Sequence, residues 1–394
     1  MLRSRLLTRR RALLLGMGVV GSIGTLGIER GRYLSHQIQA LEDKERDFAV
    51  VGGTSLGERA AAKGLIYGAA TQQQLLSSDL EFANRFAQEC KLLITEGDLL
   101  WKEIRPSPDR FDFTVGDRLA EFARTHGMLL AGGHLVWYNN LPDWFKETVN
   151  RRNAEQFLVK HIKRVVGHYA GQMHFWTVVN EAIEPPDGQP NGLRKVPWLE
   201  FLGVDYIDLA FRVAAEADPK ALLVYNDYGL DYDRPADEGR RTALLRLLER
   251  LKSKGTPIHA LGIQAHLTGS ETRFNPKKLR DFLSNVAALG LKIIITEMDV
   301  IDQGLPLNVV ARDRIIARAY EDYLTVALDE LAVSTVLTWG LSDRYTWLSW
   351  FRPRYDGSQV RPLPLDANLK PKLAWNAIAR AFDKAPMREV QRPR

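Results

Sequence analysis

Two short apolar stretches of the chain end in carboxylates. Residues 293–299 read I-I-I-T-E-M-D, so three isoleucines lead into Glu297 and Asp299. Residues 174–181 read H-F-W-T-V-V-N-E and end in Glu181. Aromatic and β-branched runs of this length predict buried strands. A lone carboxylate is costly to bury, so each strand end either meets solvent and pairs with a base or opens into a cleft that uses the acid.

The two glutamates can act together if their strands are parallel neighbours in one barrel. Both carboxylates would then project from the same end, which in an eight-stranded βα barrel carries the active site. Two carboxylates facing each other across a cleft cleave glycosidic bonds, one as an acid near neutral pH and the other ionised. Their mutual repulsion helps to separate the two pKa values.

The elements that must position these acids alternate regularly along the chain. Amphipathic helical patterns follow the strand-like runs, for example over residues 153–168 and 238–254, the second ending at Gly255 as a helix often does. Eight βα repeats predict a closed (β/α)₈ barrel in one catalytic domain, and no glycine-rich phosphate loop follows the first strand. The eight strand-like runs begin near Leu65, Leu92, Met128, His174, Leu222, Ala260, Leu291 and Val333.

Polar and aromatic side chains follow nearly every predicted strand. Any one of them alone is more often structural, because a lone Trp usually packs in a core and a lone His is usually a satisfied interior residue. Together they predict a carbohydrate cleft, in which carboxylates do the chemistry, amides and His bind hydroxyls, and indoles cover sugar faces. Besides the acids named above, the set is Glu96, His134, Trp137, Asn180, Asn226, Asp227, Gln264, His266 and Trp339.

Charge and cysteine content exclude other classes of partner. The chain of 394 residues has a formal net charge of +6, and most of this excess comes from arginines between Arg3 and Arg11, ahead of the first acid at Glu29. The rest is close to neutral and predicts no nucleic-acid partner. Cys90 is the only cysteine, so neither an internal disulfide nor a thiolate metal cluster is expected, and Cys90 itself is predicted to be a small core residue.

The N-terminal segment predicts export. Residues 8–14 read T-R-R-R-A-L-L and resemble a twin-arginine signal with Ala12 where an aromatic is usual, and an uncharged glycine-rich run extends to Ile28. That run is short for a membrane span, and the alternative is a basic tail on a cytosolic protein. The predicted division of the chain is 1–28 export signal or uncut membrane anchor, 29–55 linker, 56–384 barrel domain and 385–394 basic tail. We therefore expect a bacterial periplasmic or extracellular protein.

Several separated motifs make the chain resemble glycoside hydrolase family 10, the endo-1,4-β-xylanase family, over residues 56–382. They are W-T-V-V-N-E-A around Glu181, Y-N-D-Y at 225–228, G-I-Q-A-H-L around His266, I-T-E-M-D at Glu297, W-G-L-S-D-R-Y-T-W-L from Trp339, and P-L-P-L-D-A-N-L-K-P-K near the C-terminus. Their number and correct order make the resemblance specific.

The resemblance implies a retaining mechanism on xylan or a related polysaccharide. Glu297 would be the nucleophile and Glu181 the acid and then the base, with the carboxyls about 5–5.5 Å apart. Asn180 would bind the sugar 2-hydroxyl. His266 would bond Glu297 and be oriented by Asp299. The resemblance also places Gln264 near the nucleophile and Trp137, Trp339 and Trp347 around the sugars, and it implies a monomer with no metal or organic cofactor.

One side of the expected cleft departs from the family pattern. Gly97 and Leu100 replace the usual Asn and Lys after Glu96, Gly133 replaces the usual His, and residues 138–140 read Y-N-N instead of H-S-Q. These positions line the non-reducing side. One hypothesis is that His134 takes the role of the missing His, so that Gly133→His would rescue a His134→Ala variant.

The departures keep two other interpretations open. One is a retaining barrel hydrolase that prefers a different or modified β-glycan. The other is a barrel that binds a glycan or a partner without cleaving it, although both glutamates and Asn180 are present. Unchanged turnover in Glu181→Gln would contradict the assignment of the acid.

Overall fold

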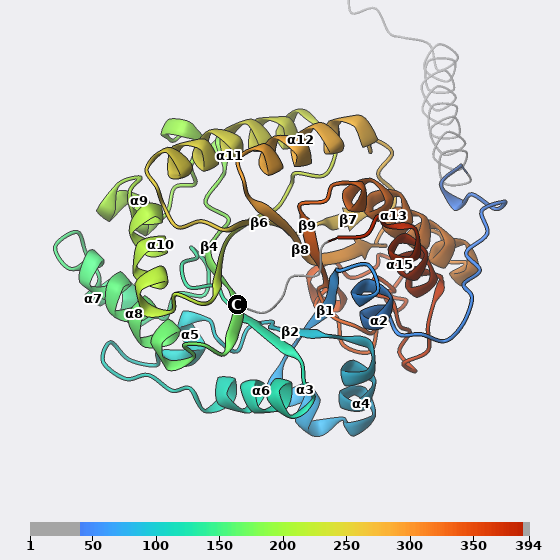
Figure 1. The fold of residues 1–394 in the computed structure, drawn as a ribbon, viewed down its shortest axis with the longest axis horizontal. Helices are drawn as coiled ribbons and strands as arrows, with labels where there is room; N and C mark the ends of the chain where they lie inside the picture. Colours follow the sequence, from blue (N-terminus) through green and yellow to red (C-terminus); the bar gives the residue numbers. More distant parts are fainter. Residues whose placement is uncertain (1–39, 389–394) are drawn as a thin grey trace, which may run out of the picture.

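The computed structural model describes residues 40–388, which form a closed barrel of parallel strands surrounded by helices (Figure 1). β1 pairs with both β2 and β9, and β6 pairs with β8, so the ring has no open edge. The predicted (β/α)₈ barrel is confirmed. The strands are β1 Ile66–Thr71, β2 Leu92–Thr95, β3 Leu129–Gly132, β4 Met173–Asn180, β5 Leu222–Asp227, β6 Ala260–Ile263, β7 His266–Thr268, β8 Lys292–Ile301 and β9 Val333–Thr338.

The sixth predicted strand is broken into two pieces. β6 ends at Ile263, and Ala265 has a left-handed backbone with φ 58° before β7 begins at His266. β7 then leaves the ring and pairs with the outer part of β8, placing His266 opposite Asp299. The break therefore brings His266 beside the strand that carries Glu297.

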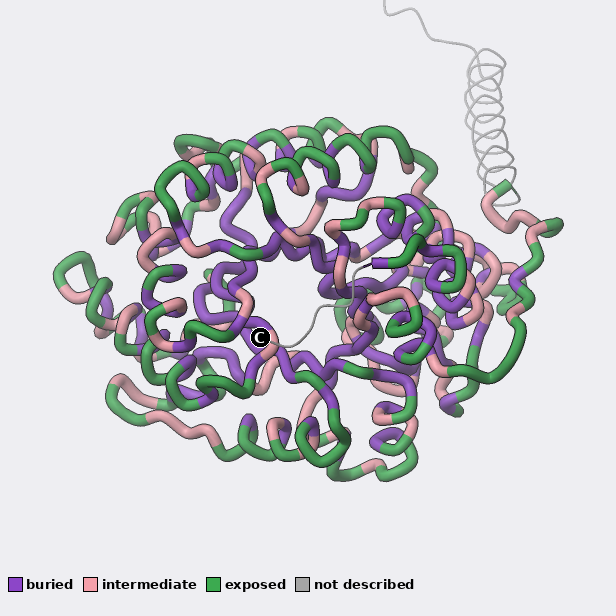
Figure 2. Tube along the Cα trace, in the orientation of Figure 1, coloured by how far each residue is buried: buried purple, intermediate pink, exposed green. Residues whose placement is uncertain are grey.

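Helices cover the outside of the ring, with their buried faces turned inward and their exposed faces outward (Figure 2). The two helices expected from sequence are present, and the second begins at Pro235, whose fixed φ suits a first turn. The helices are α2 Leu56–Ala61, α3 Gln73–Ser78, α4 Leu80–Glu89, α5 Trp101–Ile104, α6 Thr114–Thr125, α7 Trp144–Thr148, α8 Ala154–His168, α9 Pro197–Leu202, α10 Tyr206–Ala217, α11 Pro235–Ser253, α12 Pro276–Ala288, α13 Val309–Asp329, α14 Leu348–Phe351 and α15 Leu373–Lys384.

The inside of the barrel is a packed core and not a channel. Phe175 is the largest of the buried apolar side chains that fill it and is 0% exposed. Layers of such side chains fill a barrel of eight strands. The polar site must therefore lie above this core, at one end of the barrel. The other buried members are Ala70, Leu92, Ile94, Ala131, Val224, Ala260, Ile294 and Leu337.

Both ends of the described chain are bound to the barrel. Arg314 of α13 donates to the carbonyls of Asp43 and Arg46. At the other end, Arg388 is buried and donates to the carbonyls of Leu328 and Val333. The predicted export signal lies outside the described residues, as does the tail beyond residue 388. Among residues 40–388, no helix is both long and apolar enough to cross a membrane.

Candidate active site

Glu181 follows β4 directly and has a left-handed backbone with φ 56°. For a residue with a side chain, that conformation costs roughly 1–2 kcal/mol, so the surrounding structure must hold it. The Glu181 N–H donates to the carbonyl of Asn226 at 2.9 Å, and its own carbonyl accepts from Arg194 Nε at 2.7 Å. Both backbone polar groups of Glu181 are thus hydrogen-bonded, and these bonds hold the left-handed conformation.

The next two peptide groups of the turn are held by buried side chains of β5. Ala182 N–H donates to the Tyr225 hydroxyl at 3.1 Å, and Ile183 N–H donates to Asp227 Oδ2 at 3.2 Å. The Tyr225 hydroxyl in turn donates to Asp227 Oδ2 at 2.7 Å. Burial raises the pKa of Asp227 to about 6, although the Arg240 guanidinium 2.7 Å from Oδ1 opposes the rise.

Glu181 and Glu297 are joined by a chain of side-chain amides. Gln264 Nε2 donates to Glu181 Oε1 at 2.9 Å and to Asn180 Oδ1 at 3.3 Å. Asn226 Nδ2 donates to the same Asn180 oxygen at 2.9 Å and to Glu297 Oε1 at 2.7 Å. The two carboxylates therefore belong to one hydrogen-bonded unit built from four strand ends.

The other oxygen of Glu297 faces a buried histidine. His266 Nε2 lies 3.2 Å from Glu297 Oε2, and His266 Nδ1 lies 2.9 Å from Asp299 Oδ1. Burial disfavours the imidazolium, but Asp299 and then Glu297 raise the pKa of His266 to about 10. Trp347 Nε1 donates to Asp299 Oδ2 at 2.8 Å. His266 is consequently a cation at neutral pH, with one N–H group for each carboxylate.

Aromatic side chains stand around these acids. Trp137 Nε1 donates to Glu181 Oε2 at 3.0 Å, and the centre of the Trp347 ring lies 5.0 Å from that of His266. Trp339 follows β9 and packs on the barrel interior. Tyr138 stacks under the Arg194 guanidinium, 4.4 Å from the ring centre. Trp137, Tyr138 and Trp347 thus place flat aromatic faces beside the acids.

The side of the cleft that departs from the family pattern holds two titratable groups, Glu96 and His134, whose pKa values are shifted by burial. Burial raises the pKa of Glu96 to about 7, Asp98 and Glu297 act in the same direction, and a hydrogen bond from Gln72 opposes them. Burial lowers the pKa of His134 despite the opposing charge of Glu297, and its Nδ1 has no hydrogen-bond partner.

Gly133 leaves no space for a side chain. A Cβ there would lie 2.7 Å from Thr177 Cβ and 3.0 Å from the Thr177 carbonyl oxygen. A histidine at this position would displace Thr177, so failure of Gly133→His to rescue His134→Ala would not argue against a role for His134. That role stays a prediction.

All of the site residues predicted from sequence lie at the carboxyl ends of the strands or in the loops that follow them. The hydrogen bonds above join most of them directly, His134 contacts the ring of Trp137, and Trp339 stands apart on the barrel interior. Sequence reasoning placed Asp227 at a strand end beside Asn226 without giving it a role, and it did not single out Tyr225 or Arg194. The motif Y-N-D-Y could have suggested that Tyr225 acts together with Asp227, because a Tyr and an Asp at alternate positions of one strand share a face.

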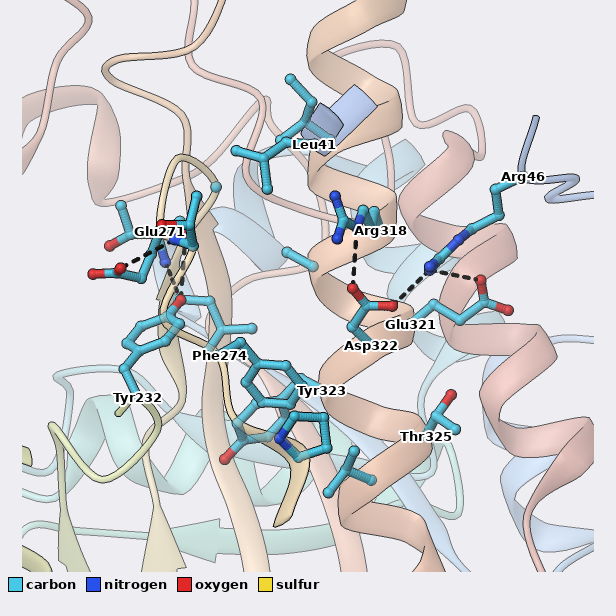
Figure 3. A pocket seen from close by; sticks show the side chains of 18 of the residues that line it. Leu41, Arg46, Tyr232, Glu271, Phe274, Arg318, Glu321, Asp322, Tyr323 and Thr325 are labelled. Carbon is cyan, nitrogen blue, oxygen red and sulfur yellow. Dashed lines mark hydrogen bonds and ion pairs between the residues drawn. The ribbon is translucent and has the colours of Figure 1, made fainter. Parts of the chain in front are cut away.

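A pocket of about 780 Å³ lies elsewhere, between α12, α13 and the start of the described chain (Figure 3). Neither Glu181 nor Glu297 lines it. Its acids are already neutralised, because Asp322 is paired with Arg46 at 2.7 Å and with Arg318 at 3.2 Å. We therefore place the chemistry at the strand ends and not in this pocket.

The closed barrel with two linked carboxylates at its carboxyl end defines the class of (β/α)₈ glycoside hydrolases. The profile of glycosyl hydrolase family 10 matches residues 55–381, and the chain belongs to this family. It is 35% identical over 307 residues to a β-1,4-xylanase of Dictyoglomus thermophilum, covering 75% of this chain and 84% of the relative. It is 31% identical over 308 residues to endo-1,4-β-xylanase B of Thermotoga neapolitana, covering 77% and 83%. The crystal structure of native xylanase 10B from Thermotoga maritima superposes with a TM-score of 0.76 at 32% identity, covering 84% of this chain and 98% of that one.

Proposed function

We propose that the protein is a retaining endo-1,4-β-xylanase that hydrolyses internal bonds of xylan. The amide-linked pair of Glu181 and Glu297 at the carboxyl end of the barrel carries this proposal. The names of the relatives support the substrate, since two proteins at 31% and 35% identity are called xylanases. A crystal structure at 30% identity, xylanase 10B from Thermotoga petrophila, is described as a complex with xylobiose.

In the first step, a carboxylate oxygen of Glu297 attacks the anomeric carbon while the glycosidic bond breaks. Glu181 delivers its proton to the departing oxygen, which leaves as the hydroxyl of the released chain. The product is a glycosyl ester of Glu297. Asn180 binds the 2-hydroxyl of the reacting sugar, and the His266 imidazolium stabilises Glu297 while it is still charged.

In the second step, Glu181 is a carboxylate and accepts a proton from water. The resulting oxygen nucleophile attacks the anomeric carbon from the face that the first product left, and the ester bond to Glu297 breaks. Two inversions give net retention. Both glutamates end in their starting protonation states.

The test is chromatographic analysis of the products that the full chain releases from glucuronoxylan, with Glu297→Gln run in parallel. Xylo-oligosaccharides from the parent and none from the variant are expected. A folded parent that releases no products would refute the proposal. Glu181→Gln provides a second arm, since unchanged turnover in that variant would contradict its role as the acid.

A second candidate is a retaining β-glycanase with another preference, and the non-reducing side of the cleft favours it. Leu100 is buried there and Gly133 offers no side chain, so fewer groups can bind hydroxyls than the family pattern provides. Products from another β-glycan in a panel, at higher kcat/KM than from xylan, would support this candidate over the first.

We also propose that the protein acts as a monomer outside the cytoplasm, exported by the twin-arginine-type signal in residues 1–28 and either released or held at the membrane by it. Replacing both Arg9 and Arg10 by Lys should leave the protein in the cytoplasm of a bacterial host, measured by cell fractionation. Normal export of that variant would refute the signal, and sedimentation of the purified protein tests the monomer.

A further inference from the structure

An aromatic patch lies on the surface next to the candidate active site. Trp350 is 72% exposed and Phe351 is 47% exposed, and both belong to the short helix α14. Large exposed aromatic side chains that gather in one place commonly mark a binding surface. We call Trp350 and Phe351 the α14 patch.

The α14 patch is continuous with the wall of the cleft. Trp347, which contacts His266, stacks on Phe351 with ring centres 4.4 Å apart and also meets Trp350 at 6.2 Å. The rings thus run without a break from the site of chemistry to the surface. A bound polymer that occupies the cleft can follow this surface outward.

The two aromatic rings of the patch differ in what they can offer. Phe351 is stacked on Trp347, and the Arg352 guanidinium lies 5.2 Å from its ring centre. Trp350 meets both Trp347 and Phe351 at steep angles, 73° and 76°, and keeps most of its surface free. Phe351 therefore supports the patch, and Trp350 is the ring available to a ligand.

The loop that follows α14 is held in place. The buried side chain of Arg354 donates to the carbonyls of Asp302 and Leu305 in the loop after β8. Gln303 Nε2 also donates to the carbonyl of Pro353 at 2.8 Å. A surface that is ordered before binding loses less entropy when a ligand arrives.

We propose that Trp350 is an additional sugar-binding position, on which a xylose unit of the same polysaccharide chain stacks outside the cleft. The axial C–H groups of a pyranose form an apolar face that matches an indole, and this face is free when the hydroxyls point into water. The inference rests on the proposed function, because the chain that crosses Trp350 is the chain that Glu181 and Glu297 cleave.

The test compares long and short substrates with the full-length protein. Trp350→Ala should lower the ratio of kcat/KM on xylohexaose to kcat/KM on xylotriose about fivefold, which corresponds to about 1 kcal/mol. Trp350→Phe keeps an aromatic face and should recover most of the ratio. Leu331→Ala is the matched control, because Leu331 is 59% exposed and precedes β9 at the opposite end of the barrel.

If Trp350→Ala keeps the parent's ratio of the two kcat/KM values, the proposal is overturned. Equal losses of kcat/KM on xylohexaose and xylotriose would also overturn it, because they would place the effect at Trp347 in the cleft. If Trp350→Ala loses binding to phosphatidylglycerol vesicles while the ratio of kcat/KM values is unchanged, the proposal is also overturned. The patch would then bind a lipid surface and not a sugar. A parent that cleaves neither oligosaccharide refutes the xylanase proposal itself and this inference with it, whereas an active parent with an unaltered ratio refutes only the role of Trp350.

Discussion

Replacing Tyr225 by Phe tests whether the turn at Glu181 is held for catalysis. The Tyr225 hydroxyl accepts from Ala182 N–H and donates to Asp227, and all three groups are buried. Without the hydroxyl, the Ala182 N–H has no partner unless the turn moves. A buried N–H left unpaired costs about 1–3 kcal/mol.

That cost sets the size of the expected effect on turnover. The turn can avoid this cost by rearranging so that the Ala182 N–H finds another partner. The conformation in which Glu181 points at the glycosidic oxygen is then less stable than the rearranged one by up to about 1–3 kcal/mol. Since about 1.4 kcal/mol corresponds to a factor of ten, we expect kcat to fall about tenfold on substrates whose leaving group needs a proton. Aryl glycosides with an acidic phenol leave without protonation, so their glycosylation step should change less.

A matched control exists in the same fold. The Tyr323 hydroxyl donates to Asp231 at 2.9 Å, and both side chains are buried, but the pair does not contact Glu181. Burial raises the pKa of Asp231 to about 6, as it does for the carboxyl next to Tyr225. Tyr323→Phe should therefore lose similar stability in urea denaturation and retain kcat. Equal kcat values for the two variants on xylan would refute the reasoning.

Three further predictions concern stability. The pKa of His266 is raised on folding, so its imidazolium stabilises the fold fully below pH 6.5. The free energy of unfolding should therefore fall as pH rises from 6.5 to 10, by at most about 1.4 kcal/mol per pH unit. In urea titrations at several pH values, His266→Gln should remove this dependence. Gly133→Ala should cost about 1–3 kcal/mol in the same assay because its Cβ meets Thr177, and an unaltered midpoint would contradict the contact. Lys372→Met should cost about 3–5 kcal/mol, since it leaves the buried carboxyl of Asp343 without its counter-ion, and a loss below 1 kcal/mol would show that this buried pair contributes little.

The barrel and the ends of its strands could be predicted from sequence because both follow from local pattern. Runs such as I-I-I-T-E change from apolar to polar near the carboxyl end of the strand, although β8 itself continues, still buried, to Val300 before it ends at Ile301. Knowing where each strand ends is enough to place Glu181 and Glu297 at one end of a parallel barrel. The family motifs then implied roles for residues whose contacts are long-range, such as His266.

The remaining features depend on contacts between segments that are far apart in the chain. Nothing local to Glu181 favours a left-handed backbone, which is imposed by the hydroxyl of Tyr225 and the guanidinium of Arg194. The break before His266 likewise requires Ala265 at φ 58°, a conformation that alanine rarely adopts by itself. The exposure of Trp350 could not be read from sequence, because a Trp in an apolar run is more often buried.

The two glutamates differ in the kind of partner that binds them, and this difference supports the assignment of their roles. Glu297 has a cation, the His266 imidazolium, on one oxygen, and this charge is itself fixed by buried Asp299. Among residues 40–388, Glu181 forms no ion pair, and its oxygens accept from the neutral N–H groups of Trp137 and Gln264. A nucleophile must remain ionised, and a neighbouring positive charge favours that state. An acid that becomes a base must gain and lose a proton in each cycle, and neutral donors leave both states accessible. Glu181 is also positioned through its backbone, whose N–H and carbonyl are both hydrogen-bonded, so that one carboxylate position serves the leaving oxygen and then the water that takes its place.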